Sequence, residues 1–355
     1  MAPDPVPVPA VPLPVPAVPQ QAARGFGTGW IHDDYDHNDK LLVDLYGMQR
    51  LEMKEVYQAI VEKAEQRTKV NLKGSCPPVY NQFGLGSCVA NATAAALRFA
   101  WKNSIVHLST PYDEFDPSRL WIYYYARLLD NERKDLEFRD TGCNIRDALK
   151  VLKKKGVCTE QAWKYLSKAE ADAVDDLQAA TKDADAMPPD CRAGIVPVTA
   201  KEKSATKFFE FGFDYHRIRS LSDVKDKAAA ADTVIKQMCA CLAEGFPIIF
   251  GFRMYYEADG KTEEFRDPKN WTGDVFNVDK LEKRGGEAGG HAVLCVGFDT
   301  NKKLFCIMNS WGNDWKDKGF FWMPFSWFER KGTTYDLWTI RPDLAPLLRD
   351  HDPIQ

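Results

Sequence analysis

The stretch NQFGLGSCVANA, residues 81–92, places a cysteine between a glycine-rich loop and a run of small residues that predicts the start of a helix. The first turn of a helix has unpaired N–H groups and the positive end of the helix dipole, which lower the pKa of a thiol. Glycines let a substrate approach the backbone closely. Cys88 is therefore either an activated nucleophile or a buried cysteine that packs as a small apolar residue, and this stretch alone favours neither.

The composition is that of an ordinary globular protein. The chain has 355 residues, of which 45% are hydrophobic and 28% are charged, and its formal net charge is −4. This length allows about two domains and a substantial core. The negative charge gives no indication of nucleic acid binding, and no apolar run approaches the roughly 18 residues of a membrane-spanning helix. We therefore expect neither a nucleic acid nor a membrane as a partner.

The nine cysteines form no recognisable metal or disulfide framework. No spacing matches a CxxC…CxxC zinc site, and a chain of this size does not depend on disulfides for its core. The first residues lack the basic and continuous apolar regions of a signal peptide. We therefore expect reduced cysteines in an intracellular setting, with no metal and no cofactor. Core packing in an expected helix explains the Cys239-x-Cys241 pair better than a metal- or redox-regulated thiol site does.

The N-terminal part differs in composition from the rest of the chain. Residues 1–22 alternate proline with small apolar residues, which predicts a disordered polyproline-type tail. This tail is either a spacing arm or, less favoured, a ligand for an SH3-like partner. Residues 23–69 form an extension whose second half predicts amphipathic helices. His32 and His37 lie near four aspartates, but their irregular spacing makes a metal site the less favoured interpretation.

The remaining sequence changes from helical to strand-like patterns. Apolar residues at helical spacing predict helices first, and short β-branched or aromatic runs broken by Gly, Asn and Asp predict strands later. The predicted helices are 88–103, 118–129 and 144–156, and the predicted strands are 246–256, 289–299, 303–311 and 319–328. Between them, residues 168–200 predict a surface insertion. This order favours an α+β fold whose two lobes meet in a cleft.

A nucleophilic cysteine needs a base, and the base needs a group that orients it. Of the six histidines, His291 begins a predicted strand directly after Gly289 and Gly290, where the edge of a cleft is open. Asn309 ends the next predicted strand, and two antiparallel strands joined by a short turn bring such a pair together. Alone, His291 would more often be a core histidine. Together with Cys88 and Asn309, it predicts a catalytic triad.

Three segments together resemble the papain-like cysteine peptidases of the cathepsin family. They are PVYNQFGLGSC (78–88), GGHAVLCVGFD (289–299) and NSWGNDWKDKGFFW (309–322), and they occur in the order of the family. The resemblance extends over roughly residues 70–335, and its form is most similar to a bacterial, viral or lower-eukaryotic branch. It implies a cysteine-type peptidase whose partner is a peptide or protein substrate.

The resemblance also implies an architecture. The expected fold has a helical left lobe, whose central helix follows the nucleophile, and an antiparallel β-barrel right lobe, with the active site in the cleft between them. The peptidase domain is expected over 70–345, with the helical lobe at about 82–165, the β lobe at about 205–340, and a tail over 346–355. Residues 23–69 are then either an inhibitory pro-segment or a permanent part of the fold.

By the same resemblance, four residues carry the catalytic roles. Cys88 is expected to be the nucleophile and to form an ion pair with His291, which later protonates the leaving amine. Asn309 is expected to orient the imidazole. The side-chain amide of Gln82 and the backbone N–H of Cys88 are expected to bind the oxyanion. In papain-like pairs the thiol pKa falls to about 3–4, so the ion pair exists at neutral pH.

Five further residues are implied to contact the substrate. Gly142 is expected to offer backbone hydrogen bonds to an extended peptide, as in strand addition. Gly251 and Gly290 are small, which predicts a roomy pocket for a large apolar or aromatic side chain at the second substrate position. Trp311 is expected to shield the hydrogen bond of the catalytic histidine from water, and Trp315 is expected to lie near the leaving group.

Three features depart from the family pattern. Leu85 stands where the family usually has a disulfide-bonded cysteine, and Val89 stands where a tryptophan usually follows the nucleophile. The usual inhibitory pro-helix motif is missing from the N-terminal extension. Activation by cleavage is therefore a hypothesis, which predicts a shorter active form.

Three functions follow from these residues, and the favoured one is an endopeptidase that hydrolyses peptide bonds through a Cys88 thioester. The same triad also suits another acyl transfer, such as transamidation or removal of a protein modifier. A third function is a catalytically idle papain fold that serves as a binding module. Such proteins usually lose the cysteine or the histidine, whereas all four catalytic positions are intact here, which argues against an idle fold.

Overall fold

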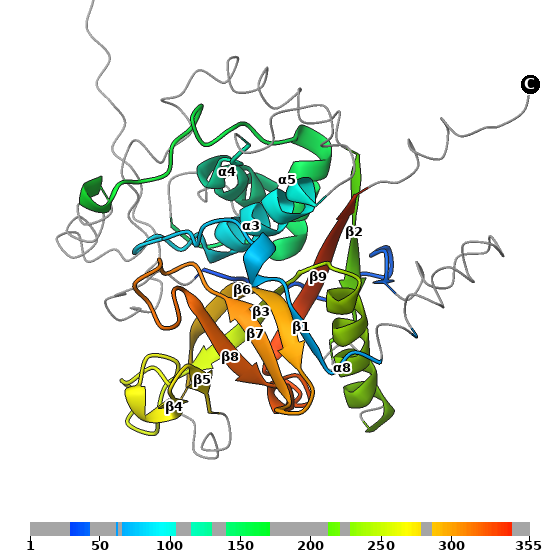
Figure 1. Cartoon of the computed structure of the whole chain (residues 1–355). Coiled ribbons are helices and arrows are strands. Elements are labelled where there is room, and N and C mark those ends of the chain that lie inside the picture. Colours follow the sequence, from blue (N-terminus) through cyan, green and yellow to red (C-terminus); the bar gives the residue numbers. More distant parts are fainter. Residues whose placement is uncertain are drawn as a thin grey trace, which may run out of the picture.

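The computed structural model describes residues 29–42, 62, 66–103, 115–129, 140–170, 212–220, 228–277 and 286–342, with the backbone alone over 228–233. The predictions for the tails 1–22 and 346–355, and for most of the insertion 168–200, lie outside these residues. Within them, most helices gather on one side, and the strands lie on the other side together with one further helix (Figure 1). The prediction of a two-lobe α+β fold is confirmed.

The helical lobe contains the three helices that the periodicity predicts. They are α3 (Cys88–Lys102), α4 (Arg119–Leu129) and α5 (Ile145–Lys155). Small residues let α3 pack in the centre of the molecule, where most of its side chains are buried. The side chain of Asn144 caps α5 by accepting the backbone N–H of Asp147 at 2.7 Å. After α5, Gly156 adopts a φ of 70°, which favours glycine.

The second lobe is built on a nine-stranded sheet with the order β2-β9-β3-β6-β7-β8-β5-β4, and β1 pairs with β6. Neighbouring strands are antiparallel except β5 and β8. The strands are β1 (Lys69–Asn71), β2 (Phe213–Ile218), β3 (Ile248–Tyr255), β4 (Trp271–Thr272), β5 (Val275–Phe276), β6 (Glu287–Asp299), β7 (Leu304–Met308), β8 (Phe320–Pro324) and β9 (Thr334–Pro342). Helix α8 (Ala228–Ala243) lies beside them, and three short 3-10 turns cover Lys73–Ser75, Pro268–Asn270 and Phe325–Trp327.

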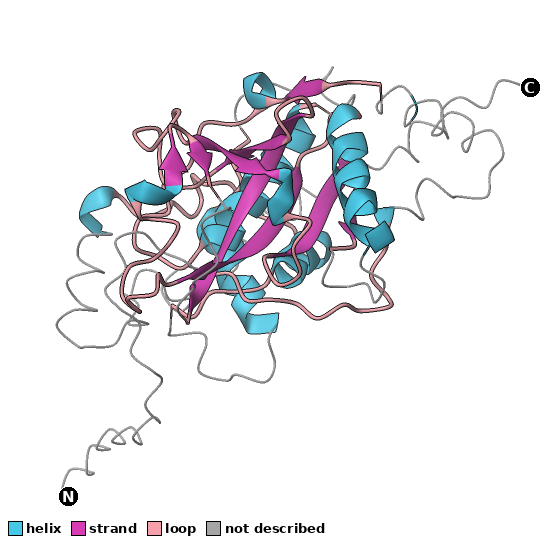
Figure 2. Cartoon of the chain, turned by 90° about the horizontal axis from the view of Figure 1, so that it is seen from below, coloured by secondary structure: helices cyan, strands magenta, loops and turns pink. Residues whose placement is uncertain are grey.

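Strand β6 separates two hydrophobic cores. Its alternate side chains Ala292 and Leu294 pack with α3, α4 and α5, whereas Val293 and Cys295 pack toward α8. This alternation follows from the two-residue period of a strand. Viewed from below, the strands cross in front of the helical lobe, with α8 at their side (Figure 2). Both faces of β6 are buried from His291 onward, so the strand holds this histidine within the packed interior.

Residues 29–42, which we call the cleft segment, run between the two lobes (blue in Figure 1). Trp30 forms a parallel β-bridge with Cys143 just before α5, and Leu41 forms one with Arg217 in β2. The segment therefore touches the helical lobe at one end and the sheet at the other. In the part of the chain that the structure describes, no helix is both long and apolar enough to span a membrane.

Candidate active site

Cys88 is the first residue of α3 and is fully buried at the junction of the lobes. Its Sγ accepts a hydrogen bond from the backbone N–H of Ala292 in β6 at 3.4 Å. The backbone N–H groups of Gly29 and Val89 also face the sulfur. Because the N–H groups of the first helical turn lack intrahelical partners, this position favours negative charge on sulfur.

His291 precedes Ala292 on β6, and its ring is held in one orientation. The distance from His291 Nε2 to Asn309 Oδ1 is 2.8 Å, and Oδ1 also accepts the N–H of Ser310 at 2.9 Å. Because the amide oxygen of Asn309 can only accept hydrogen bonds, the proton of this bond lies on Nε2 of His291. Nδ1 is buried and has no hydrogen-bond partner among the described residues. It is therefore the nitrogen left to exchange a proton with a thiol.

An aromatic cage surrounds this imidazole. The ring centroids of Trp311, Phe252 and Phe265 lie 5.1, 5.6 and 6.2 Å from the His291 ring. Trp315 packs on Trp311 at 5.2 Å, one layer further out. Trp311 thus lies against the catalytic candidate, as its proposed shielding role requires, while Trp315 contacts the ring only through its neighbour.

Burial changes the ionisation of both reacting groups. Loss of solvent raises the pKa of the Cys88 thiol to about 11, against the opposing effect of the N–H groups of Ala292, Gly29 and Val89. Loss of solvent also lowers the pKa of His291 to about 4, although its bond to Asn309 favours the charged form. While the cleft segment covers the site, both shifts therefore oppose the ion pair that we expect between the two groups.

Gln82 lies on the loop that leads to α3. Its backbone N–H donates to Ser310 O at 2.9 Å, and its side-chain Oε1 accepts the hydroxyl of Ser310 at 2.5 Å. The side-chain Nε2 donates to Leu85 O at 3.0 Å. These bonds hold the amide on the loop that carries Cys88, with its N–H groups on the side of the loop backbone. The loop is also tied to the residues after Asn309.

Asp140 and Tyr165 also hold this loop, and the sequence analysis identified neither. Both carboxylate oxygens of Asp140 accept the N–H of Gly86 at 2.9 Å, and the Tyr123 hydroxyl donates to the same carboxylate. The hydroxyl of Tyr165 donates to Gln82 O at 3.0 Å and lies 2.5 Å from Ser87 Oγ. For Asp140, the available signal in the sequence was an acidic residue directly before the segment TGC (141–143), which was expected to line the cleft.

The predicted substrate-binding glycines line the path of the cleft segment. Gly290 O accepts the N–H of Trp30 at 3.2 Å. Gly142 donates its N–H to the Tyr123 hydroxyl at 3.0 Å and so is directed into the helical lobe. The cleft segment pairs with the next residue, where the N–H of Cys143 donates to Gly29 O at 2.9 Å and Cys143 O accepts from Ile31 at 3.0 Å. The expected bonds from Gly142 to a substrate stay a prediction.

Three glycines make this close approach sterically feasible. A Cβ on Gly29 would lie 1.9 Å from Gly86 O. A Cβ on Gly251 or on Gly290 would lie 2.0 or 2.4 Å from the indole of Trp30. Real Cβ atoms do not approach other atoms so closely, so glycine is required at each of these positions. The two glycines on β3 and β6 therefore leave a pocket over this face of the sheet, and the indole of Trp30 fills it.

Charged residues anchor the rest of the cleft segment. Arg146 of α5 binds Asp33 at 3.2 Å and Asp39 at 2.8 Å, and Arg217 of β2 binds Asp39 at 3.1 Å. All four side chains are at most 11% exposed. Two of the four aspartates that the sequence showed around His32, Asp33 and Asp39, are thus paired with arginines from two different elements.

The structure gives the remaining candidate metal or thiol residues other surroundings. The ring of His32 packs on Tyr335 at 4.3 Å, and His37 is exposed beside Asp36. The thiol of Cys241 is buried and lies 3.5 Å from the backbone oxygen of Phe246. Across the described ranges, no group of three or more His, Cys, Asp or Glu side chains is arranged to hold a metal ion.

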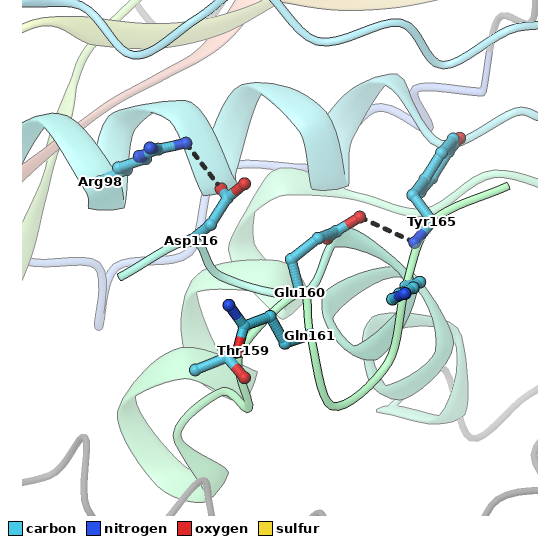
Figure 3. A pocket seen from close by; sticks show the side chains of 7 residues that line it. Arg98, Asp116, Thr159, Glu160, Gln161 and Tyr165 are labelled. Carbon is cyan, nitrogen blue, oxygen red and sulfur yellow. Dashed lines mark hydrogen bonds and ion pairs between the residues drawn. The ribbon is translucent and has the colours of Figure 1, made fainter. Parts of the chain in front are cut away.

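A separate polar pocket of about 540 Å³ lies on the helical lobe (Figure 3). Its lining residues are Arg98, Asp116, Thr159, Glu160, Gln161, Lys164 and Tyr165. Arg98 binds Asp116 at 3.0 Å, and Glu160 accepts the backbone N–H of Tyr165 at 2.7 Å. None of the catalytic candidates lines this pocket, so the chemistry of Cys88 belongs to the filled cleft between the lobes.

Comparisons with known proteins identify the family of the chain. The family described as papain family cysteine protease matches residues 126–327, which include His291 and Asn309. An uncharacterized peptidase C1-like protein of Acanthamoeba polyphaga mimivirus is 32% identical over 273 residues, which cover 77% of this chain and 72% of the viral protein.

Solved structures give the same result. Xylellain, a cysteine protease from Xylella fastidiosa, is 31% identical with a TM-score of 0.64, and the match covers 90% of this chain and 98% of xylellain. The fold is shared by a digestive procathepsin L2 proteinase from the larval midgut of Tenebrio molitor. This protein is 17% identical with a TM-score of 0.51, and the match covers 92% of this chain and 81% of the procathepsin. The chain belongs to the papain family and is a papain-like cysteine peptidase.

Proposed function

We propose that the protein is a cysteine endopeptidase that uses Cys88, His291, Asn309 and Gln82 in the roles that the sequence suggests. Nδ1 of His291 takes the proton of Cys88, and the thiolate attacks the carbonyl carbon of a peptide bond. The resulting oxyanion is bound by the Gln82 amide and the N–H of Cys88. His291 then protonates the leaving amine, which leaves a thioester that water hydrolyses to the free acid and the thiol.

One observation carries this proposal. The N–H of Ala292 bonds to the sulfur of Cys88, and the adjacent His291 has Nε2 fixed by Asn309 and Nδ1 without a partner. The base therefore lies on the strand that contacts the nucleophile, with one nitrogen anchored and the other available. A base held in this way can take the proton of the thiol when its free nitrogen comes within hydrogen-bond reach of the sulfur.

We further propose that the intact chain is a latent form. The cleft segment occupies the path of a substrate, and Trp30 pairs with Cys143 in the parallel sense. The N–H of Gly29 faces the sulfur of Cys88. The Gly29 carbonyl and the Ile31 N–H then bond to the N–H and the carbonyl of Cys143. The segment therefore occupies the backbone groups that an extended substrate would use beside Cys88.

The catalytic roles are tested with fluorogenic peptides on the full chain carrying Trp30→Ala, which removes the side chain that fills the pocket. We expect Cys88→Ala in that background to abolish hydrolysis. Gln82→Ala should lower kcat by about 10²–10³ with little change in KM, because the oxyanion forms only in the transition state. If Gln82→Ala lowers kcat/KM only by raising KM, with kcat unchanged, the assigned role of Gln82 is contradicted.

The two other functions make different predictions in this assay. If the triad serves another acyl transfer, Cys88 forms the acyl-enzyme but an added amine, not water, is the main acceptor. If the fold is an idle binding module, the Trp30→Ala chain binds peptides without cleaving them. Product analysis by mass spectrometry in the presence and absence of an added amine separates the three outcomes.

A further inference from the structure

We propose that Asp336 determines substrate specificity and that the pocket now filled by Trp30 selects an aromatic side chain with an N–H donor, such as tryptophan. This inference rests on the proposed peptidase function, and it adds a polar requirement to the apolar or aromatic preference that the small glycines suggest. Asp336 lies on β9, outside the three segments that carry the family resemblance, and 306 residues after Trp30.

The walls of the pocket fit a large flat ring. Gly251 and Gly290 give the indole of Trp30 direct access to the backbone of β3 and β6. The ring of Tyr335 lies 5.7 Å from the Trp30 ring, at an angle of 35°. Together these contacts bury the indole to 6% exposure. A side chain of similar size and shape in a substrate fills the same volume.

A buried carboxylate forms the polar end of this pocket. Asp336 Oδ2 accepts the indole Nε1–H of Trp30 at 3.1 Å and the backbone N–H of Asp33 at 2.9 Å. His32 Nδ1 lies 3.4 Å from the same oxygen. The second oxygen, Oδ1, is held by Arg217 at 3.2 Å. Asp336 itself is fully buried.

The two oxygens of Asp336 therefore have different kinds of partner. Oδ1 is bound by β2, which belongs to the permanent sheet, whereas the contacts described for Oδ2 come from the cleft segment. When the segment leaves, Oδ2 faces the pocket and has lost these donors. A buried charged oxygen without a donor is costly. A substrate side chain that supplies an N–H removes this cost, and a purely apolar side chain does not.

The surrounding charges favour a neutral donor over a cation. Departure of the cleft segment removes Asp33 and Asp39, which pair with Arg146 and Arg217. The carboxylate of Asp336 is then left beside two guanidinium groups from which these acids have been withdrawn. An arginine or lysine of a substrate gains little attraction there, because the nearby positive charge opposes it. An indole donates one hydrogen bond without adding charge.

The backbone of Asp336 also fits a role beyond packing. Its φ of 53° is in the left-handed region, which is unfavourable for a residue with a side chain, although Asp and Asn tolerate it better than most. This conformation directs the carboxylate to both Arg217 and Trp30. A glycine would relieve the strain and lose the pocket carboxylate.

The first test uses the full chain and its own pocket occupant. The readout is the rate at which iodoacetamide alkylates Cys88, which requires an open cleft but no peptide hydrolysis. Trp30→Phe keeps an aromatic ring and removes the donor, and we expect it to raise the rate about tenfold or more, since a hydrogen bond to a charged group is worth this much. In an Asp336→Asn background, Trp30→Phe should change the rate less than twofold.

Asp336→Asn is chosen because it preserves volume. Arg217 requires the amide oxygen, so the amide NH₂ faces the pocket and no longer accepts the indole N–H. Circular dichroism and the melting temperature establish that each variant is folded. If Trp30→Phe raises the rate equally with Asp336 and with Asn at this position, the proposal is wrong.

The second test uses substrates on the full chain carrying Trp30→Ala. Otherwise identical fluorogenic peptides carry Trp, Phe, Leu or Arg at the second residue before the cleaved bond. We expect kcat/KM for Trp to exceed that for Phe by about tenfold, with Leu and Arg lower still, and Asp336→Asn to bring the Trp/Phe ratio close to one.

The two tests separate failure of this inference from failure of the proposed function. A Trp/Phe ratio that Asp336→Asn leaves unchanged, or a preference for Leu or Arg, overturns the role of Asp336 while peptide hydrolysis stands. If no peptide is cleaved although Cys88 is alkylated, the peptidase proposal fails, and the alkylation rates still decide whether Asp336 reads an N–H donor in this pocket.

Discussion

Asp140 and Asp336 are both fully buried carboxylates beside the cleft, and they bind different parts of the molecule. Asp140 accepts hydrogen bonds from Gly86 and Tyr123, which belong to the nucleophile loop and to α4. Asp336 accepts hydrogen bonds from Trp30 and the residues just after it, in a segment that covers the active site. The first carboxylate holds a part of the permanent fold, and the second holds an occupant of the cleft.

A buried carboxylate can thus either hold the permanent fold, as Asp140 does, or bind a removable occupant of the cleft, as Asp336 does. Asp140 connects the loop before Cys88 to the wall that pairs with an extended chain, because Tyr123 also accepts the N–H of Gly142. It does so near Leu85, where the family usually has a disulfide. A non-covalent tie of this kind does not depend on an oxidising compartment. Asp336 instead offers an oxygen whose donors are exchanged when the segment leaves.

The largest effect is expected from Asp140→Ala. It leaves the N–H of Gly86 and the hydroxyl of Tyr123 without their buried acceptor, which should lower the free energy of unfolding by about 2–5 kcal/mol. Chemical denaturation measures this loss. Tyr123→Phe is the matched control, because it removes the hydroxyl that bonds to Asp140 and Gly142 but keeps the bond between Asp140 and Gly86. It should lower the free energy of unfolding by about 1–2 kcal/mol. Equal effects of the two variants would mean that the Gly86 bond contributes little.

The next effect concerns the occupant of the pocket. Trp30→Ala removes a buried indole, which is worth about 3–5 kcal/mol in a core, so alkylation of Cys88 in the full chain should accelerate by about 10²–10³-fold. Tyr35→Ala is the matched control, since Tyr35 is an aromatic residue of the same segment with 38% exposure. We expect it to change the rate less than threefold. Comparable acceleration by both variants would indicate that the whole segment, and not the pocket, limits access to the thiol.

A smaller effect is expected from pH through Asp33. Burial raises the pKa of Asp33 to about 7, and Asp336 adds to this, while Arg146 opposes it and Asp147 contributes weakly. A carboxyl whose pKa is higher in the docked segment than in the free one favours docking at acidic pH, and this contribution is lost as the pH rises through about 7. The cleft should therefore be more closed at pH 5.5 than at pH 8.5.

This pH effect is measured as the ratio of alkylation rates in the Trp30→Ala chain and the unmodified chain. The ratio cancels the titration of the thiol itself. We expect it to fall several-fold between pH 5.5 and pH 8.5, and Asp33→Asn to remove the change. A ratio that rises with pH would assign the opposite sign to the coupling between Asp33 and its neighbours.

Local patterns in the sequence predicted most helices and strands of the fold and the candidate catalytic residues. The three helices of the first lobe and four of the longer strands agree with the structure within a few residues, because their periodicity and the Gly156 stop are local. His291 and Asn309 meet as the antiparallel pairing of β6 and β7 requires. The order of the nine strands in the sheet was not predicted, because it depends on contacts between strands that are distant in sequence.

The rest of the site was not predictable from local patterns. Trp30, Cys143 and Asp336 come together from the N-terminal extension, the turn before α5 and the last strand. Neither the spacing nor the composition of such distant segments indicates a contact between them. The sequence showed the helix terminus at Cys88, which lowers the pKa of the thiol, but not the segment that buries the thiol and raises its pKa.

The most direct test of the account is covalent labelling by an epoxysuccinyl-peptide inhibitor, followed by peptide mapping, of the full chain and of the full chain carrying Trp30→Ala. We predict slow labelling of the first and rapid labelling of the second, in both cases at Cys88, with none after Cys88→Ala. Labelling at another cysteine, or no labelling of the folded Trp30→Ala chain, would contradict the claim that Cys88 is the nucleophile of a peptidase whose cleft is closed by its own N-terminal segment.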